Sequence, residues 1–251
     1  MPDKGIVYYT DNILKESFAC VIRKILKLSA GAVPIVWVSQ KPINEEPNIV
    51  VGKIGRNHKS ICIQILEGLK SLSTDIVFLA EHDVIYHPSH FYFMPPREDI
   101  FYYNRNRYWL DSRTGQASTN SNCFGALSQL SSYRKLAEVH YEERLNAYNK
   151  GINVRKFHGT EPGKHKGNIL TNYGIDEFFS EWPNIDIRHD KNFTKSDRFK
   201  GNYILVDTIP YWGRTKNRYE EFIDSLRGES VRSCNYGNKL RFDNNGIGYT
   251  E

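Results

Sequence analysis

The amino-acid sequence predicts an α/β fold in which a mixed β-sheet is flanked by helices. Up to Asp83, short apolar runs alternate with amphipathic helical segments, which favours parallel βαβ units. The run at 75–83 has five apolar residues among its first six positions and ends in carboxylates, as expected for a strand buried on both faces. Beyond this run, aromatic strands are separated by polar turns, so the sheet as a whole is expected to be mixed.

The N-terminal elements follow from hydrophobic periodicity. Residues 6–10 form a β-rich run, and residues 14–28 carry apolar side chains at the spacing of an amphipathic helix that ends near Gly31. Strands are expected at 33–39 and 48–51. A polar turn at 55–59 then opens a second helix, whose buried stripe is Ile61, Ile65, Leu66, Leu69 and Leu72.

The middle of the chain predicts a hairpin, a strand and a helix. Residues 100–103 and 108–110 are strand-like and flank a polar turn, which favours a β-hairpin. A further strand is expected at 121–127. The charged segment 131–148 is expected to be helical, with Leu136, Val139 and Leu145 facing inward.

The last part of the chain is less regular. Residues 150–168 are basic and loop-like, helical character returns at 176–179, and residues 185–188 alternate like a strand. A helix is expected near 219–226. We therefore predict one domain over residues 1–207, followed by a C-terminal extension over 208–251.

Composition excludes several protein classes. In this chain of 251 residues, 25% are charged and 39% hydrophobic, as in globular proteins that are neither disordered nor embedded in a membrane. No apolar run approaches the roughly 18 residues that span a bilayer, and the polar N-terminus does not resemble a signal peptide.

Cysteine spacing and net charge give weaker indications of the cellular compartment and of the binding partner. The four cysteines are dispersed, without the spacing of a metal site or a disulfide framework, so we expect a cytoplasmic protein. The net charge of +5 suits an anionic substrate but does not by itself demonstrate nucleic-acid binding.

The end of the central strand carries the clearest chemical signal. Glu81 and Asp83 are two residues apart, so on an extended chain both point to one side and can share a hard cation. His82 then faces the other way and is expected to be structural. Ligands of open α/β sheets bind outside these carboxyl ends. The alternative, that charged residues merely mark where solvent begins, remains open.

Several segments, in this order, resemble the nucleotide-sugar half of a GT-A glycosyltransferase, a Rossmann-type mixed sheet. The similarity covers about residues 5–195 and rests on 8–12, 55–59, 75–83, 172–177 and 185–194. In that family the central strand ends in an Asp-x-Asp signature, and the matching triplet here is Glu81-His82-Asp83, which departs at Glu81. The segment 172–177 resembles the second acidic motif, at the start of a helix.

The resemblance implies a metal-assisted donor site. Glu81 and Asp83 would bind Mn²⁺ or Mg²⁺ together with the diphosphate of a nucleotide sugar, and His189 would be an additional ligand. For an inverting transfer, Asp176 is expected to be the base, with Glu177 as the alternative. His189 could instead be a surface histidine, and the acidic pair could simply favour a helix N-terminus.

Four further residues are expected to contact the donor. Thr10 and Asp11 follow the first strand and would lie near the nucleoside, although a helix cap needs no ligand. Arg56 and Lys59 would meet the base or the diphosphate, or else be solvated charges.

The acceptor hydroxyl is left open between nucleic acid and glycan. Arginines are interleaved with aromatic residues over 97–113, and the basic loop adds cations, which suits binding to phosphates and stacking on bases. A phage-type member acting in its host's cytoplasm would glycosylate a 5-hydroxymethylpyrimidine in DNA. The other acceptors are a saccharide or a lipid-linked glycan.

Two other function classes remain. A metal-dependent nuclease or phosphotransferase would need acidic ligands converging on two metals. A non-catalytic nucleic-acid-binding module would bind through its basic and aromatic surface and would use no metal.

Overall fold

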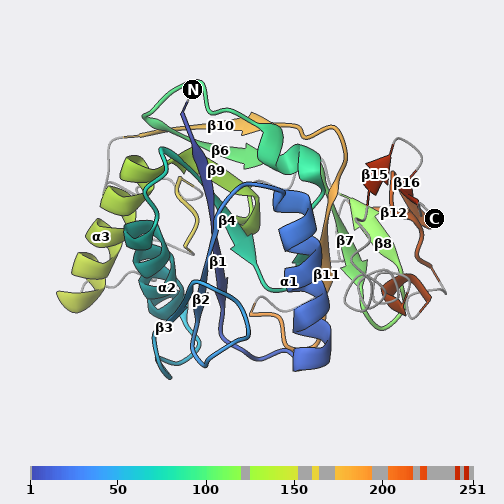
Figure 1. Cartoon of the computed structure of the whole chain (residues 1–251), viewed down its shortest axis with the longest axis horizontal. Helices are drawn as coiled ribbons and strands as arrows, with labels where there is room; N and C mark the ends of the chain where they lie inside the picture. Colours follow the sequence, from blue (N-terminus) through green and yellow to red (C-terminus); the bar gives the residue numbers. More distant parts are fainter. Residues whose placement is uncertain are drawn as a thin grey trace.

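The computed structural model describes residues 2–119, 125–151, 160–163, 173–193, 203–216, 221–224, 241–243 and 246–248. Two sheets dominate this part of the chain (Figure 1). The larger is a seven-stranded mixed sheet in the order β10-β6-β9-β4-β1-β2-β3, and the smaller is a five-stranded sheet in the order β12-β8-β7-β11-β5. The predicted α/β fold class, a mixed sheet flanked by helices, is confirmed.

Six of the seven strands in the large sheet run in the same direction. Strand β4 is parallel to β1, and only β9 is antiparallel to its neighbours β4 and β6. The carboxyl ends of β1 and β4 therefore meet at one edge. The strands are β1 (Lys4–Thr10), β2 (Ile35–Ser39), β3 (Asn48–Val50), β4 (Ile76–Glu81), β6 (Ile100–Asn104), β9 (Leu130–Tyr133) and β10 (Gly174–Phe178).

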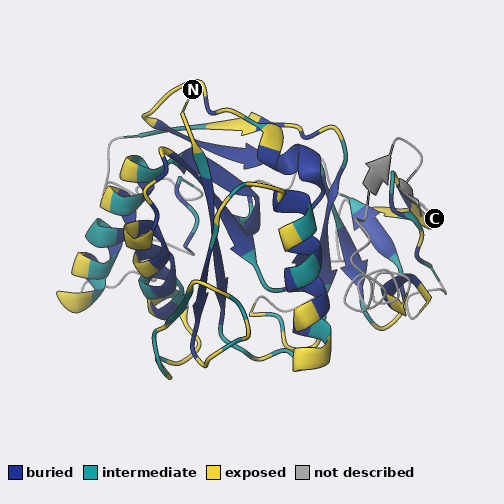
Figure 2. Ribbon diagram, in the orientation of Figure 1, coloured by how far each residue is buried: buried dark blue, intermediate teal, exposed yellow. Residues whose placement is uncertain are grey.

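Three long helices cover this sheet. Helices α2 (His58–Ser71) and α3 (Arg134–Asn149) pack on one face, and α1 (Glu16–Ala30) packs on the other. Alternation along β1 divides its side chains accordingly, with Val7 facing α2 and Ile6 facing α1. The five residues of β4 before Glu81 are fully buried, as the apolar run predicts (Figure 2).

The second sheet lies on the other side of α1. Helix α1 packs on it through Val21, Ile22 and Ile25, while Leu26 and Ala30 pack on the large sheet. Helix α1 is therefore wedged between the two sheets. The strands of the second sheet are β5 (Val84–Ile85), β7 (Arg107–Asp111), β8 (Ala117–Thr119), β11 (Asn184–Arg188) and β12 (Ile204–Val206).

Short elements complete the described chain. Ile209 and Trp212, near the C-terminal end, pack in the same apolar cluster as α1 and the second sheet. The division into residues 1–207 and 208–251 stays a prediction. No described helix combines the length and apolarity needed to cross a membrane. The short elements are η1 (Pro88–Tyr92), η2 (Leu127–Gln129), β13 (Thr208–Ile209), β14 (Gly213–Arg214), β15 (Arg241–Asp243), β16 (Gly246–Gly248) and a helical turn at 221–224.

The predicted hairpin at 100–110 is wrong. Both strands exist, but β6 belongs to the large sheet and β7 to the second sheet. The Asn104 side chain accepts a hydrogen bond from the backbone N–H of Asn106 at 3.0 Å, and also one from Ser180 at 3.1 Å. This side-chain turn redirects the chain between sheets, and hydrophobic periodicity cannot reveal it.

Two predicted helical segments also need correction. Residues 174–178 form edge strand β10, in which Phe178 is buried and stacks on Phe93 at 3.9 Å between ring centroids. Asp176 and Glu177 are both exposed on this edge strand. In α3, which begins after β9, Val139 is exposed rather than buried.

Residues 121–124 of the strand expected at 121–127, Cys123 among them, lie outside the described residues. Where the description resumes, residues 125 and 126 are in neither a strand nor a helix, and η2 begins at Leu127. The helix expected at 219–226 is described only as the turn at 221–224.

Replacement of Gly68 by alanine should destabilise the fold by loosening α2. A Cβ atom at Gly68 would lie 2.4 Å from Val7 Cγ1, so α2 must move away from β1. Overpacking of this kind destabilises by about 1–3 kcal/mol, which thermal unfolding would detect. The double variant Gly68→Ala/Val7→Ala should lose less stability than the sum of the two single changes. Strictly additive effects would show that this contact does not limit the packing.

Candidate functional site

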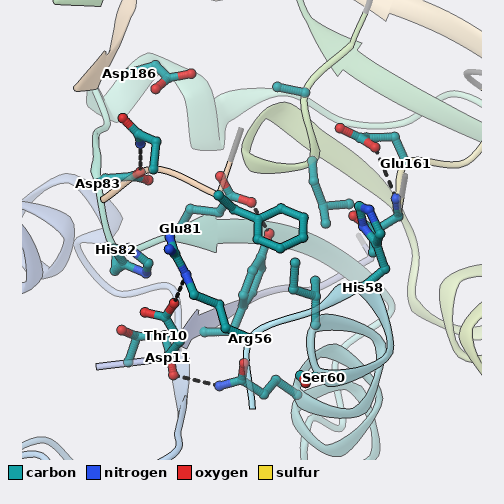
Figure 3. Close-up of a pocket in the computed structure, with 18 of the residues that line it drawn as sticks. Thr10, Asp11, Arg56, His58, Ser60, Glu81, His82, Asp83, Glu161 and Asp186 are labelled. Atoms are coloured by element: carbon teal, nitrogen blue, oxygen red, sulfur yellow. Dashed lines mark hydrogen bonds and ion pairs between the residues drawn. The ribbon is translucent and has the colours of Figure 1, made fainter. Parts of the chain in front are cut away.

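A pocket opens where the two sheets meet, at the carboxyl edge of the large sheet (Figure 3). It is lined by the ends of β1 and β4, the start of α2, strands β7 and β11, and residues from 125–127, 160–161 and 192–193. It contains about 1080 Å³ of space, part of it open to solvent.

One wall of the pocket is built around Arg56. Its Nε donates to Asp11 Oδ2 at 2.6 Å, and its terminal nitrogen donates to the carbonyl of Lys191. The guanidinium lies 5.8 Å from the centre of the Phe193 ring. Arg56 thus joins the end of β1 to the loop after β11. Thr10 also lines this wall.

The start of α2 is fixed against the end of β1. Asn57 caps the helix by accepting a hydrogen bond from the Ser60 N–H at 3.0 Å. Gln64 donates to the carbonyl of Thr10 at 2.7 Å. The polar turn that opens this helix is confirmed, and the positive end of the helix faces the pocket, which favours an anion there. Lys59 is exposed and is not among the pocket residues.

Glu81 lies at the base of the pocket. Tyr9 Oη donates to Glu81 Oε1 at 2.5 Å. Burial raises the pKa of Glu81 to about 8 and the nearby charge of Asp83 acts in the same direction, while the Tyr9 hydrogen bond opposes both. In the absence of a cation, this carboxyl therefore holds a proton at neutral pH.

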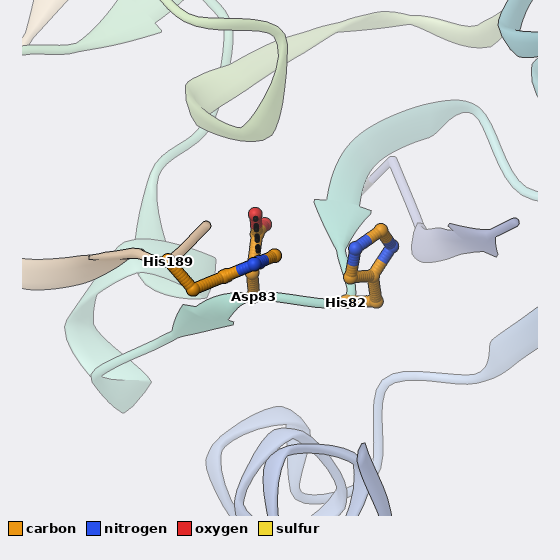
Figure 4. Close-up of side chains that lie close together, drawn as sticks. All are labelled: His82, Asp83 and His189. Carbon is orange, nitrogen blue, oxygen red and sulfur yellow. Dashed lines mark ion pairs between the residues drawn. The ribbon is translucent and has the colours of Figure 1, made fainter. Parts of the chain in front are cut away.

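Asp83 belongs to a separate cluster of possible metal ligands, the Asp83 group, which consists of His82, Asp83 and His189. Ligand atoms of His82, Asp83 and His189 lie within 4.8 Å of one another (Figure 4). The expectation that His82 faces away is wrong, because the chain turns at residues 82–83 and the alternation of an extended strand no longer applies. Glu81 is not part of this group in the described structure.

Neighbouring polar groups hold Asp83 in its charged form. Its Oδ2 accepts a hydrogen bond from Asn192 Nδ2 at 2.7 Å, and His189 Nε2 lies 3.4 Å away. Burial alone would raise the pKa of Asp83, but His82, His189 and Arg188 outweigh it and lower the pKa. The carboxylate is therefore ionised at neutral pH and available to a cation.

The side chains of this group fit a divalent cation. One carboxylate and two imidazoles suit Mn²⁺ better than Mg²⁺, which prefers oxygen ligands. His189 Nε2 is buried and makes no hydrogen bond within the described residues, as expected of an atom that faces a ligand site. However, His189 Nδ1 accepts the Lys191 N–H at 3.1 Å, so the proton of the neutral ring is on Nε2. His189 can bind a metal only if this tautomer changes, whereas Asp83 is ready to bind one.

The two residues expected to supply the base lie elsewhere. Asp176 and Glu177 are on the edge strand β10 and are absent from the pocket lining, and Glu177 forms an ion pair with Arg105. Strand β11 instead brings Asp186 and Arg188 to the pocket, where they pair at 3.1 Å. The alternation of 185–188 could have revealed that these two share a face.

Other pocket residues could not be identified as site residues from the sequence pattern. Glu161 comes from a loop, and Arg107 and Asn192 are ordinary polar residues near strand ends. Tertiary packing alone brings them to the pocket. Figure 3 shows Glu161 and Asp186 on opposite sides of the site.

The aromatic and basic stretch at 97–113 does not form an open stacking surface. Tyr102, Tyr103 and Trp109 are buried. Arg97 pairs with Asp99 at 2.7 Å, and Arg113 pairs with Asp111 at 3.0 Å. Most of the basic loop at 150–168 lies outside the described residues.

Comparison with known proteins gives only remote similarities. No protein-family model and no curated protein matches the chain. A glycosyltransferase involved in glycosylation of the major capsid of the virus PBCV-1 is 8% identical, with a TM-score of 0.43 over 71% of this chain and 82% of that one.

Two structures of the glycosyltransferase GlyE of Streptococcus pneumoniae are also similar. One is 9% identical, with a TM-score of 0.48 over 93% of this chain and 64% of that chain. The apo form is 12% identical, with a TM-score of 0.38 over 70% of this chain and 45% of that chain. These similarities are too remote to assign an activity.

The Asp83→Asn variant should lose Mn²⁺ binding while keeping its fold. The change removes the charged oxygen ligand but preserves side-chain size, so calorimetric titration should show an affinity at least tenfold weaker. Asp190→Asn is the matched control, because Asp190 is exposed in the loop after β11, next to His189, and lies outside the group. Equal Mn²⁺ binding by the two variants would place the cation elsewhere.

Proposed function

We propose that the protein is a metal-dependent glycosyltransferase that moves a sugar from a nucleotide-diphosphate sugar to an acceptor hydroxyl. One observation carries the proposal. A single pocket is lined by His82 and Asp83 of the Asp83 group, by the positive end of α2 and by the polar end of β1. A nucleotide-diphosphate sugar presents a polar nucleoside next to clustered negative charge, which matches these three features.

The donor would lie along the carboxyl edge of the large sheet. Thr10 and Asp11 would contact the nucleoside, and Arg56 would contact the base or the diphosphate. His82 and Asp83 would hold Mn²⁺ or Mg²⁺, with His189 and Glu81 as further ligands once the proton on each is displaced. The bound cation would neutralise the charge that develops on the leaving diphosphate.

For an inverting transfer we place the base at Glu161 rather than at Asp176. The loop segment that carries Glu161 is fixed by two buried tyrosine hydroxyls, one on β6 and one on α3. Tyr141 donates to the carbonyl of Thr160 at 3.2 Å, and Tyr103 donates to that of Pro162 at 2.8 Å. These contacts hold a carboxylate at the pocket, as proton transfer from an acceptor hydroxyl requires. Asp186, a carboxylate on the opposite side of the pocket, is paired with Arg188.

A glycan is the acceptor that we propose. A DNA acceptor needs exposed aromatic side chains for the displaced base and cations for the phosphates. The aromatic residues of 97–113 that would stack are largely buried. We therefore propose a saccharide or a lipid-linked glycan as acceptor, in preference to a 5-hydroxymethylpyrimidine in DNA.

The same geometry weighs against the two other function classes. Two-metal phosphoryl transfer needs several acidic ligands converging on two ions, whereas the group found among the described residues contains one carboxylate. A non-catalytic module would have no need of a buried carboxylate held in its charged form.

Nucleotide sugars should stabilise the protein in a Mn²⁺-dependent manner. A ligand present at a hundred times its dissociation constant adds about 2.7 kcal/mol to the free energy of unfolding, which is a visible thermal shift. A panel of nucleoside diphosphates and nucleotide sugars, each with and without Mn²⁺, should identify the donor base. Asp83→Asn should lose the Mn²⁺-dependent part of the shift. The proposed donor site would be refuted if no compound in the panel shifted the melting temperature.

Glu161→Gln should lower turnover of the donor without weakening its binding. Loss of a base removes a step that occurs only in the transition state, so kcat should fall by about 10²–10⁴-fold while KM stays unchanged. Release of nucleoside diphosphate measures this. Asp176→Asn and Glu177→Gln are the comparison variants and should behave like the wild type. A loss confined to either of them would return the base to β10.

A further inference from the structure

Arg107 is an arginine inside the pocket that the donor contacts above do not use. It lies at the start of β7, is only 7% exposed and lines the pocket. Its guanidinium lies 4.7 Å from the centre of the Trp109 ring. Stacking on a buried indole fixes the plane and position of the guanidinium.

Arg107 differs from Arg56 and Arg188, the other pocket arginines, because it is not paired with a carboxylate among the described residues. Arg56 pairs with Asp11 at 2.6 Å, and Arg188 pairs with Asp186 at 3.1 Å. Within the described residues, the Arg107 guanidinium forms neither an ion pair nor a hydrogen bond. A buried cation without a partner is unfavourable, because it loses hydration without gaining a counter-charge. A negatively charged ligand group would supply that counter-charge.

The position of Arg107 indicates which part of the donor it meets. Strand β7 belongs to the second sheet, where Trp109 is in register with Asp186 on β11. The nucleoside site at Thr10 and Asp11 belongs to the large sheet, and the turn at Asp83 joins the two sheets. A donor with its nucleoside at β1 and its diphosphate beside Asp83 would extend its sugar towards β7.

The chemistry of the guanidinium narrows the choice of sugar. A fixed, planar fork of N–H donors matches a carboxylate, which can accept two parallel hydrogen bonds. A neutral hexose offers only hydroxyls and would leave the charge of Arg107 uncompensated. The acidic group of a uronic acid would satisfy both the charge and the geometry.

We propose that Arg107 binds a carboxylate on the transferred sugar, so that the donor is a nucleotide-diphosphate uronic acid. This specificity presupposes the glycosyltransferase activity proposed above. Arg107 would set the identity of the sugar, while the nucleotide would be held by the β1 and α2 wall and by the Asp83 group.

Calorimetric titration with matched neutral and acidic donors tests this specificity in the full chain. The pairs are UDP-glucose with UDP-glucuronate and GDP-mannose with GDP-mannuronate, each with Mn²⁺, and UDP and GDP serve as references. The wild type should bind the acidic member of one pair about ten- to a hundredfold more tightly than the neutral member, as expected for hydrogen bonds to a charged group. This comparison requires no variant.

Arg107→Gln should abolish that preference and leave the affinity for the nucleoside diphosphate unchanged. Arg107→Lys, which keeps the charge but not the fork, should retain only part of the preference. Arg113→Gln is the matched control, since Arg113 lies just beyond β7, is 70% exposed at its side chain and pairs with Asp111. Circular dichroism checks the fold of each variant.

Two different failures can be told apart. If no nucleotide or nucleotide sugar binds, the glycosyltransferase proposal itself fails. If neutral and acidic donors bind equally, or if Arg107→Gln weakens UDP or GDP as much as the acidic donor, the nucleotide site stands. In that case the carboxylate assignment is refuted, and equal weakening would make Arg107 a ligand of the diphosphate.

Discussion

The site depends on one backbone constraint, the turn by which the chain leaves the large sheet and enters the second. Strand β4 ends at Glu81 and β5 begins at Val84. The backbone N–H of Ile187 donates to the carbonyl of Asp83 at 2.9 Å, which ties this turn to β11. With β4 buried on both faces and β5 paired to β11, the two residues between them have little freedom. Their side chains are directed into the pocket by the fold itself.

The same turn separates two carboxylates that lie two residues apart in the sequence. Glu81 remains at the end of the large sheet, where Tyr9 binds it and burial raises its pKa to about 8. Asp83 lies beyond the turn, where His82, His189 and Arg188 outweigh burial and lower its pKa. Two carboxyl groups only two residues apart therefore hold different charges at neutral pH, because the turn places them in different surroundings.

Sequence reasoning succeeded where one periodic signal decides the local structure. The strands near 6–10 and 35–39 and helices α1 and α2 were predicted because a buried stripe and a turn signal agree. It failed where a side chain redirects the backbone, as Asn104 does between β6 and β7. It also failed at 174–178, where pairing with β6 outweighs local helical character.

The site was predictable in part, and for similar reasons. Thr10, Asp11, Arg56, Glu81 and Asp83 line the pocket because they follow elements that the sequence reveals. The inclusion of His82 was missed because strand alternation was extended across a turn. Glu161 and Arg107 were not predictable, since no local pattern indicates which loops and strands meet at the edge of another sheet.

The relation between the two walls of the pocket rests on α1. One side of this helix packs on the large sheet through Leu26 and Ala30, and the other packs on the second sheet through Ile22 and Ile25. The close-packed apolar contacts on both sides leave few alternative arrangements of the sheets. The separation between the nucleotide wall and the β7 wall is therefore set mainly by a core that touches no ligand. Because Arg107 lies on the second sheet and Asp11 follows a strand of the large sheet, the length of donor that fits between them would follow from the packing of α1.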